Sequence, residues 1–102
     1  MLVAFSVAPS GTGRTDGSVH DAVAAAVRIV RDSGLPNHTD AMFTTIEGEW
    51  DEVFEVIRQA TEVVGDYGSR VSLVLKADIR PGYTGELEAK VDRLEAAIDN
   101  DG

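Results

Sequence analysis

The spacing of hydrophobic and polar positions changes several times along the chain, and each change marks an expected element. Residues 2–8 form a short apolar run rich in β-branched and aromatic side chains, which predicts a buried strand. The apolar residues that follow recur at helical spacing and define one face of an amphipathic helix. They are Val19, Ala22, Val23, Ala26, Val27 and Val30. Ser18 followed by Asp21 resembles a capping box at the start of this helix, and Gly34 with Pro36 ends it.

The middle of the chain is rich in Thr, Met and Phe, which favour strands over helix. We expect a short strand at 37–41, a tight connection and a second strand at 43–47; one bent strand fits the same pattern. An amphipathic helix is expected over residues 49–65, with acidic residues in its first turn that suit the helix dipole. Its predicted inner face is made by Trp50, Val53, Phe54, Ile57, Ala60 and Val64.

Residues 70–79 have strong β propensity and predict a further strand, which Pro81 and Gly82 end. Thr84 is the expected cap of a third helix. The apolar positions of that helix are Leu87, Val91, Leu94 and Ile98. The predicted order is β-α-β-β-α-β with a trailing helix, in one domain spanning residues 1–102. This is the ferredoxin-like arrangement of the α+β class: a four-stranded antiparallel sheet with two helices on one face, here with a C-terminal helix added.

The first strand carries apolar or small side chains on both of its faces. Strand alternation places Val3, Phe5 and Val7 on one face, and Leu2, Ala4 and Ala8 on the other. In a sheet whose helices cover one face only, this pattern indicates that a second subunit covers the outer face. We therefore expect a homodimer or homotetramer formed through the sheet.

Composition and charge narrow the classes of partner. The hydrophobic fraction of 43% and the charged fraction of 26% are those of an ordinary globular protein. The net charge of −9, with scattered Lys and Arg, argues against nucleic acid and anionic membranes as partners. The absence of cysteine excludes disulfides, a thiolate nucleophile and zinc–thiolate sites. The first apolar run stops at Pro9, too early for a signal peptide, so we expect a cytoplasmic protein.

No combination of nucleophile, base and orienting partner is evident, so we expect neither an enzyme nor a catalytic cofactor or metal. Gly11, Thr12 and Gly13 lie between a strand and a helix start, where backbone amides can cradle an anion; the stretch also fits a plain connector. Arg14 in the same loop invites comparison with acylphosphatases, although the loop sequence of that family is absent.

The densest acidic cluster is Glu47–Glu52, which lacks the ligand spacing of a calcium loop. Glu47 is expected on a strand, where its carboxylate can accept hydrogen bonds from an amine or lie near a cation. Thr44, Thr45 and Ser6 could supply neutral hydrogen bonds nearby. An interface-facing or solvent-facing Glu47 remains the alternative.

The stretch TTIEGEWDEVFEVI, residues 44–57, resembles the signature of the small thiamine-binding-protein family. The opening VAFSVAPSGTG resembles the first strand and Gly-Thr loop of that family, and the resemblance in element order runs over residues 2–98. It implies a ferredoxin-like fold, sheet-mediated dimers assembling into tetramers, and binding of thiamine or its hydroxymethylpyrimidine part without catalysis. The motif positions carried over are Ser6, Pro9, Gly11, Thr12, Thr44, Glu47, Gly48 and Trp50. The chain departs from the family pattern at Thr39, Ala41 and Phe43 and in an inserted Arg14-Thr15-Asp16.

Thiamine is a cation with an aminopyrimidine ring, so its binder needs a carboxylate, hydroxyl groups and an aromatic wall. In view of the resemblance, Glu47, Thr44, Ser6 and either Phe5 or Phe43 are suited to these roles, and free thiamine fits better than its diphosphate. The expected ligand-binding residues are Ser6, Gly11, Thr12, Phe43, Thr44, Thr45, Glu47 and Trp50. Strand alternation puts Thr44 and Glu47 on opposite faces unless a bulge intervenes. The alternatives are a regulatory or interaction module whose open sheet face binds another protein, and an acylphosphatase-like hydrolase.

Overall fold

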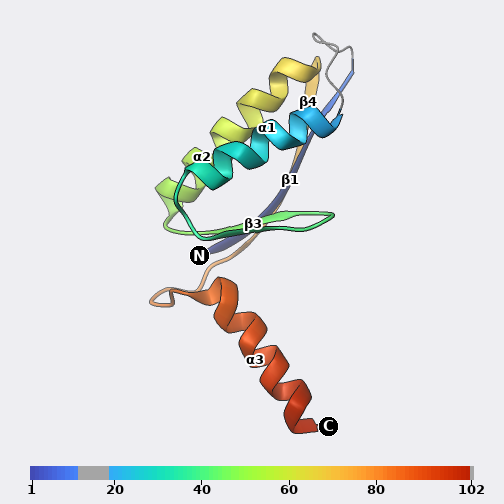
Figure 1. The fold of residues 1–102 in the computed structure, drawn as a ribbon. Coiled ribbons are helices and arrows are strands. Elements are labelled where there is room, and N and C mark those ends of the chain that lie inside the picture. The colour runs from blue at the N-terminus through green and yellow to red at the C-terminus, as the bar shows by residue number, and fades with distance from the viewer. Residues whose placement is uncertain (12–18, 102) are drawn as a thin grey trace.

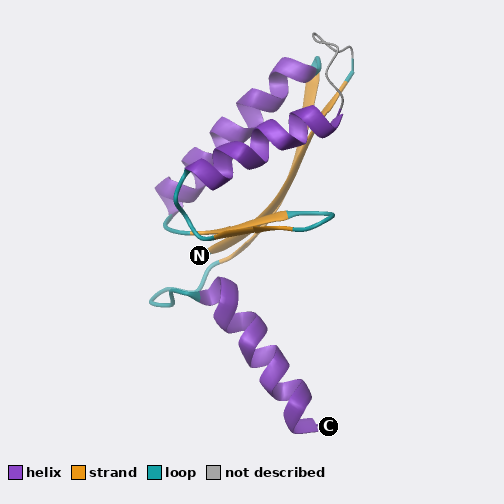
Figure 2. Cartoon of the chain, in the orientation of Figure 1, coloured by secondary structure: helices purple, strands orange, loops and turns teal. Residues whose placement is uncertain are grey.

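A computed structural model describes residues 1–11 and 19–101 (Figures 1 and 2). The chain runs through strand β1, helix α1, strands β2 and β3, helix α2, a short 3-10 turn, strand β4 and helix α3. Their bounds are β1 Leu2–Ser10, α1 Val19–Asp32, β2 Asn37–Thr39, β3 Thr44–Glu47, α2 Trp50–Val64, the 3-10 turn Gly65–Tyr67, β4 Arg70–Asp78 and α3 Glu86–Asp101. Ser18, Thr12, Gly13 and Arg14, which carried predictions, lie outside the described residues.

The four strands form one antiparallel sheet in the order β2-β3-β1-β4. β1 pairs with β4 over its whole length, from Leu2 opposite Asp78 to Ser10 opposite Arg70. Its pairing with β3 is shorter and ends at Phe5 opposite Thr44. This order and the helices between the strands confirm the predicted ferredoxin-like α+β fold, and the hairpin of β2 and β3 confirms two strands rather than one.

Helices α1 and α2 lie side by side over one face of the sheet (Figure 1). Val3, Phe5 and Val7 of β1 point into this layer and are almost completely buried. The amphipathic faces of both helices close over them, which buries the apolar surface that drives folding. The core residues are Val3, Phe5, Val7, Ala22, Ala26, Val30, Ile46, Val53, Val56, Ile57, Ala60 and Val64.

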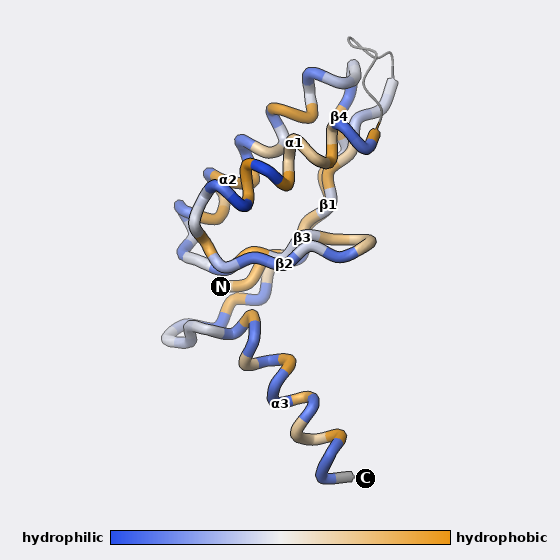
Figure 3. Tube along the Cα trace, viewed as in Figure 1, coloured by the Kyte–Doolittle hydropathy of each residue, from blue (hydrophilic) through white to orange (hydrophobic). Residues whose placement is uncertain are grey.

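The opposite face of the sheet has no helix layer in the described part of the chain. Leu2 and Ala4 are half-buried there, and Val74 of β4 is 56% exposed. Helix α3 begins near the N-terminus and β3, and it projects away from the sheet (Figure 1). Its apolar stripe of Val91, Leu94 and Ile98 is more than half exposed, and Figure 3 shows apolar positions recurring along the helix.

Three details of the prediction are wrong. Trp50 does not join the inner face of α2: it is 54% exposed and stacks on Phe54, with ring centroids 5.2 Å apart. Val19, at the start of α1, is likewise exposed. Thr84 does not cap the third helix. That helix begins at Glu86, and its first amides are capped from another element, as described below.

Candidate ligand-binding site

The turn of the β2–β3 hairpin is closed by Asp40. Its carboxylate oxygen Oδ1 accepts hydrogen bonds from the backbone N–H groups of Met42 (2.8 Å) and Phe43 (2.9 Å), while the N–H of Asp40 donates to the carbonyl of Phe43. An aspartate that bonds the backbone two and three residues ahead is a local turn former. The same N–H groups lower the pKa of Asp40, because they favour the charged carboxylate. The turn therefore holds Phe43 and a carboxylate at the tip of the hairpin.

A pocket of about 170 Å³, here called the hairpin pocket, opens between this turn, β1 and α1. Its apolar walls come from Phe5 and Val7 of β1, from one face of α1, and from Phe43. The residues that line it are Phe5, Ser6, Val7, Ala8, Val23, Ala26, Val27 and Thr39–Thr44. Among these described lining residues Asp40 alone is ionisable. The pocket thus combines aromatic and aliphatic walls with a single carboxylate.

Two threonine hydroxyls add a polar element to the wall. Thr39 of β2 lies opposite Thr44 of β3, and their Oγ1 atoms are 3.1 Å apart, a hydrogen bond in which either can donate. Thr44 is only 6% exposed. A hydroxyl carries one donor and two acceptor positions, so this pair retains capacity to bond a third group.

The backbone of β1 supplies further polar groups. β3 stops opposite Phe5, so residues Ser6–Ser10 pair with β4 on one side and with no strand of the described chain on the other. Ser6 opposes the open-face residue Val74 and therefore directs its side chain away from the helices. Met1 and Gly48 exchange both backbone hydrogen bonds, so the main chain of every second residue from Met1 onward faces β3. Val7 is therefore the first residue of β1 whose N–H and C=O point to the unpaired edge, whereas those of Ser6 point to β4. An unpaired strand edge presents N–H and C=O groups that need partners. A flat ligand with adjacent donors and acceptors matches such an edge.

The remaining predicted ligand residues lie elsewhere. Thr45 shares the open face of the sheet with Glu47, and the pairing of β1 with β3 is regular, so no bulge brings them toward Thr44. Trp50 lines a different pocket, to which Tyr83 also contributes. Gly11 ends β1 with a φ of 78°, close to Ser69, where a Cβ would lie 2.1 Å from Oγ. Of the eight predicted residues, Ser6, Phe43 and Thr44 come together in the hairpin pocket; Thr12 lies outside the described residues.

Glu47 has a different set of partners. It is 6% exposed, and its two carboxylate oxygens accept hydrogen bonds from the backbone N–H groups of Glu86 (3.0 Å) and Leu87 (3.2 Å) at the start of α3. Both oxygens of this carboxylate therefore already bond α3, and little of the side chain is exposed to a ligand. Its role as a ligand carboxylate stays a prediction, and Asp40 is the acidic group that the hairpin pocket contains.

Sequence reasoning missed Asp40 and the α1 contribution to the pocket. The strand predicted over 37–41 includes Asp40, whereas β2 ends at Thr39 and Asp40 begins the turn; an aspartate before a short connection is a turn signal. Val23 and Val27 were assigned to the core by their spacing. Val23 is 39% exposed and lines the hairpin pocket.

The described residues contain no group of three or more His, Cys, Asp or Glu side chains able to hold a metal ion. Within the same ranges, no helix has the length and apolar character needed to cross a bilayer.

Comparison with known proteins shows which family the chain resembles. A family model described as thiamine-binding protein matches residues 3–95. A UPF0045 protein from Mycobacterium bovis is 52% identical over 96 residues, which cover 93% of this chain and 91% of that protein. A UPF0045 protein from Synechocystis is 31% identical over 101 residues, with 98% and 81% covered.

Solved structures agree with the sequence comparison. A hypothetical protein from Methanocaldococcus jannaschii matches with a TM-score of 0.79 at 29% identity and covers 92% of this chain and 94% of its own. A Thermotoga maritima protein named for thiamine biosynthesis or salvage matches with a TM-score of 0.70 at 23% identity, covering 87% and 94%, a likeness of fold alone. Because the family model spans nearly the whole sequence, the chain belongs to the thiamine-binding protein family.

Proposed function

We propose that this protein is a non-catalytic binding protein for thiamine or its hydroxymethylpyrimidine part, with the ligand in the hairpin pocket. The observation that carries the proposal is the meeting of an aromatic wall, an unpaired strand edge and one carboxylate in that pocket. The family to which the chain belongs supports the choice of ligand, as does the name of the Thermotoga maritima protein of similar fold.

The chemistry of each part of the ligand has a counterpart in the pocket. An aminopyrimidine is flat and carries donors and acceptors along one edge, so it can stack on Phe43 and bond the backbone of β1 at Val7. The cationic thiazolium ring is attracted to the carboxylate of Asp40. Among the described lining residues no cation is available to clamp a phosphate, which favours free thiamine over its diphosphate.

Calorimetric titration of the purified protein with thiamine and with hydroxymethylpyrimidine tests the proposal. Phe43→Ala should weaken binding of both ligands, because both lose the ring that they stack on. Asp40→Asn keeps an oxygen for the turn but removes the charge, so it should weaken thiamine and leave the neutral hydroxymethylpyrimidine unchanged. Absence of heat with either ligand at millimolar concentration would exclude this function.

Neighbouring threonines provide a matched control. Thr44 faces the helices and lines the pocket, whereas Thr45 faces the open side of the sheet. Thr44→Val should weaken binding by about tenfold, the value of one hydrogen bond, and Thr45→Val should bind like the wild type. Equal losses in both variants would place the ligand outside the hairpin pocket.

We further propose that the protein acts as a homo-oligomer in which a second copy covers the open sheet face. Val74 on that face and the α3 stripe of Val91, Leu94 and Ile98 are exposed apolar surface of the kind that assembly buries. The alternative occupant is a different protein, as in a regulatory or interaction module. A stoichiometric complex with another protein that survives Phe43→Ala, together with no thiamine binding, would favour that alternative.

A further inference from the structure

Two of the glutamates in the signature stretch, Glu47 and Glu49, serve two different helices. Glu49 precedes α2 and forms a capping box: its side chain accepts from the backbone of Glu52, and its own N–H donates to the Glu52 carboxylate at 3.1 Å. Glu47 lies at the end of β3 and reaches across to α3, whose first two amides it binds. The first contact is local, and the second joins segments 39 and 40 residues apart.

The segment between β4 and α3 does not by itself define where α3 points. It contains Gly82 and Gly85, both with positive φ (83° and 70°), and a Cβ at either would meet nothing within 4 Å. Glycine adopts many backbone conformations, so such a linker permits several helix directions. Helix α3 projects away from the sheet (Figure 1), and among the described elements its main contact is with β3.

A carboxylate with this burial needs partners, and α3 provides them. The N–H groups in the first turn of a helix have no partner within the helix, and the positive end of the helix dipole favours an anion there. Both oxygens of Glu47 are used, which fixes the helix start in position and direction more firmly than a single bond would. An exposed ion pair between Lys90 of α3 and Asp78 of β4 adds a contact between α3 and a second strand.

We infer that Glu47 is a positioning residue that sets the direction in which α3 leaves the sheet, and so presents the apolar stripe of α3 to the partner copy. The signature glutamate then serves assembly rather than ligand contact. The part that concerns the partner copy rests on the proposed homo-oligomer; the part that concerns the direction of α3 does not.

The direction of α3 can be measured directly, because the chain has no cysteine. Spin labels on Ala24→Cys in α1 and Glu95→Cys in α3, both exposed positions, report the distance between the helix layer and α3. Doubly labelled protein is diluted into unlabelled protein so that only distances within one chain contribute. The wild type should give one narrow distribution, and Glu47→Ala a broad one.

Hydrogen exchange separates positioning from general stability. Glu47→Ala should accelerate exchange of the first-turn amides of α3 at least tenfold and leave peptides from β1 and α2 unchanged. Glu47→Gln, which keeps one acceptor oxygen, should fall between the two. The matched control Glu49→Ala should accelerate only the start of α2 and keep the spin-label distribution narrow.

A narrow, unshifted distance distribution in Glu47→Ala, or faster exchange spread evenly over the whole chain, would overturn the inference. A wild-type protein that stays monomeric would refute the proposed assembly and the presentation of α3 to a partner, while the spin-label distances would still decide whether Glu47 sets the direction of α3.

Discussion

Gly48 separates the two capping glutamates and brings the N-terminus, β3 and α2 together. Its carbonyl accepts a hydrogen bond from the amino group of Met1 (2.7 Å), and its N–H donates to the Met1 carbonyl (3.1 Å). A Cβ at this position would lie 3.1 Å from Val53 Cγ2 and 3.4 Å from Leu35 Cδ1. The central glycine of the signature is therefore explained by close packing between buried segments.

Substitution Gly48→Ala should lower the free energy of unfolding by about 1–3 kcal/mol, the usual cost of overpacking. Gly65→Ala is the control, since its Cβ would meet only Val71 Cγ2 at 3.8 Å, an ordinary contact. Urea unfolding measures both. A Gly48→Ala protein as stable as the wild type would show that Val53 and Leu35 give way without cost.

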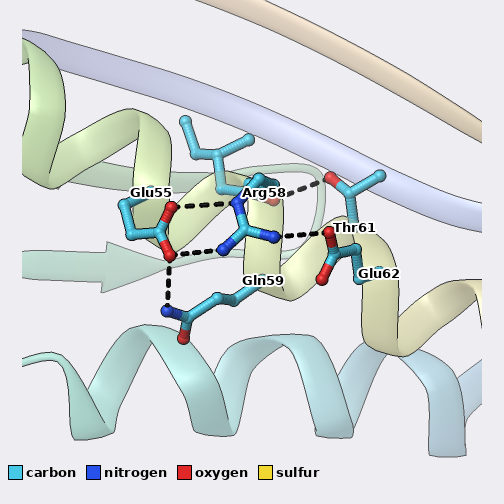
Figure 4. Close-up of polar contacts among 6 residues, drawn as sticks. Glu55, Arg58, Gln59, Thr61 and Glu62 are labelled. Carbon is cyan, nitrogen blue, oxygen red and sulfur yellow. Dashed lines mark hydrogen bonds and ion pairs between the residues drawn. The ribbon is translucent and has the colours of Figure 1, made fainter.

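At the scale of a single element, α2 is stabilised by contacts between residues close in sequence, both at its first turn and on its exposed face. The capping box of Glu49 and Glu52 satisfies its first amides. On the exposed face Arg58 donates to Glu55 one turn earlier and to Glu62 one turn later, and Gln59 also donates to Glu55 (Figure 4). These contacts follow helical spacing and need no tertiary partner.

The pH dependence of stability should carry a contribution from Glu55. Hydrogen bonds from Arg58 and then Gln59 lower the pKa of Glu55 from 4.5 to about 2. A carboxyl whose pKa is lower in the folded state stabilises the fold above pH 4.5, and that contribution is lost as the pH falls from 4.5 through about 2. The urea midpoint of the wild type should exceed that of Glu55→Gln at pH 7, and the gap should close over this interval. The gap should be small and shrink in high salt, because the pair is exposed; a gap independent of pH would contradict it.

The whole molecule is one layer of helices over one face of a sheet, with the other face and most of α3 uncovered by described residues. Two valines lie on these surfaces: Val74 on the open face (56% exposed) and Val91 on α3 (54%). A third valine of nearly equal exposure, Val19 at the start of α1 (57%), lies outside them. If a second copy covers the first two, only those positions lose exposure on assembly.

Val74→Glu and Val91→Glu should each weaken self-association by tenfold or more, because each places a charge in an apolar contact. Val19→Glu changes the net charge identically and should leave association unchanged. Sedimentation over a range of protein concentrations measures all three. Association that responds equally to the three substitutions would show a general effect of charge instead of an interface.

Much of this fold follows from the sequence because its signals are local. The period of 3.6 in the apolar positions predicts α1 and α2, and apolar, β-branched runs predict β1 and β4, all to within a few residues. The prediction is wrong where the contact that decides the structure joins residues far apart in the sequence. Thr84 is a reasonable cap by sequence, but the cap that α3 receives is Glu47, contributed by a strand far away in the chain.

The candidate site divides in the same way. The sequence by itself determined that Thr44 and Glu47 lie on opposite faces of one strand, since side chains alternate along any strand. It could not determine that β3 pairs with only the first half of β1, because strand length depends on pairing between segments. Only the tertiary structure therefore revealed the unpaired edge at Val7 and the pocket beside Asp40. It also decided that the buried carboxylate of Glu47 meets α3: a buried charge takes the partners that the fold brings to it.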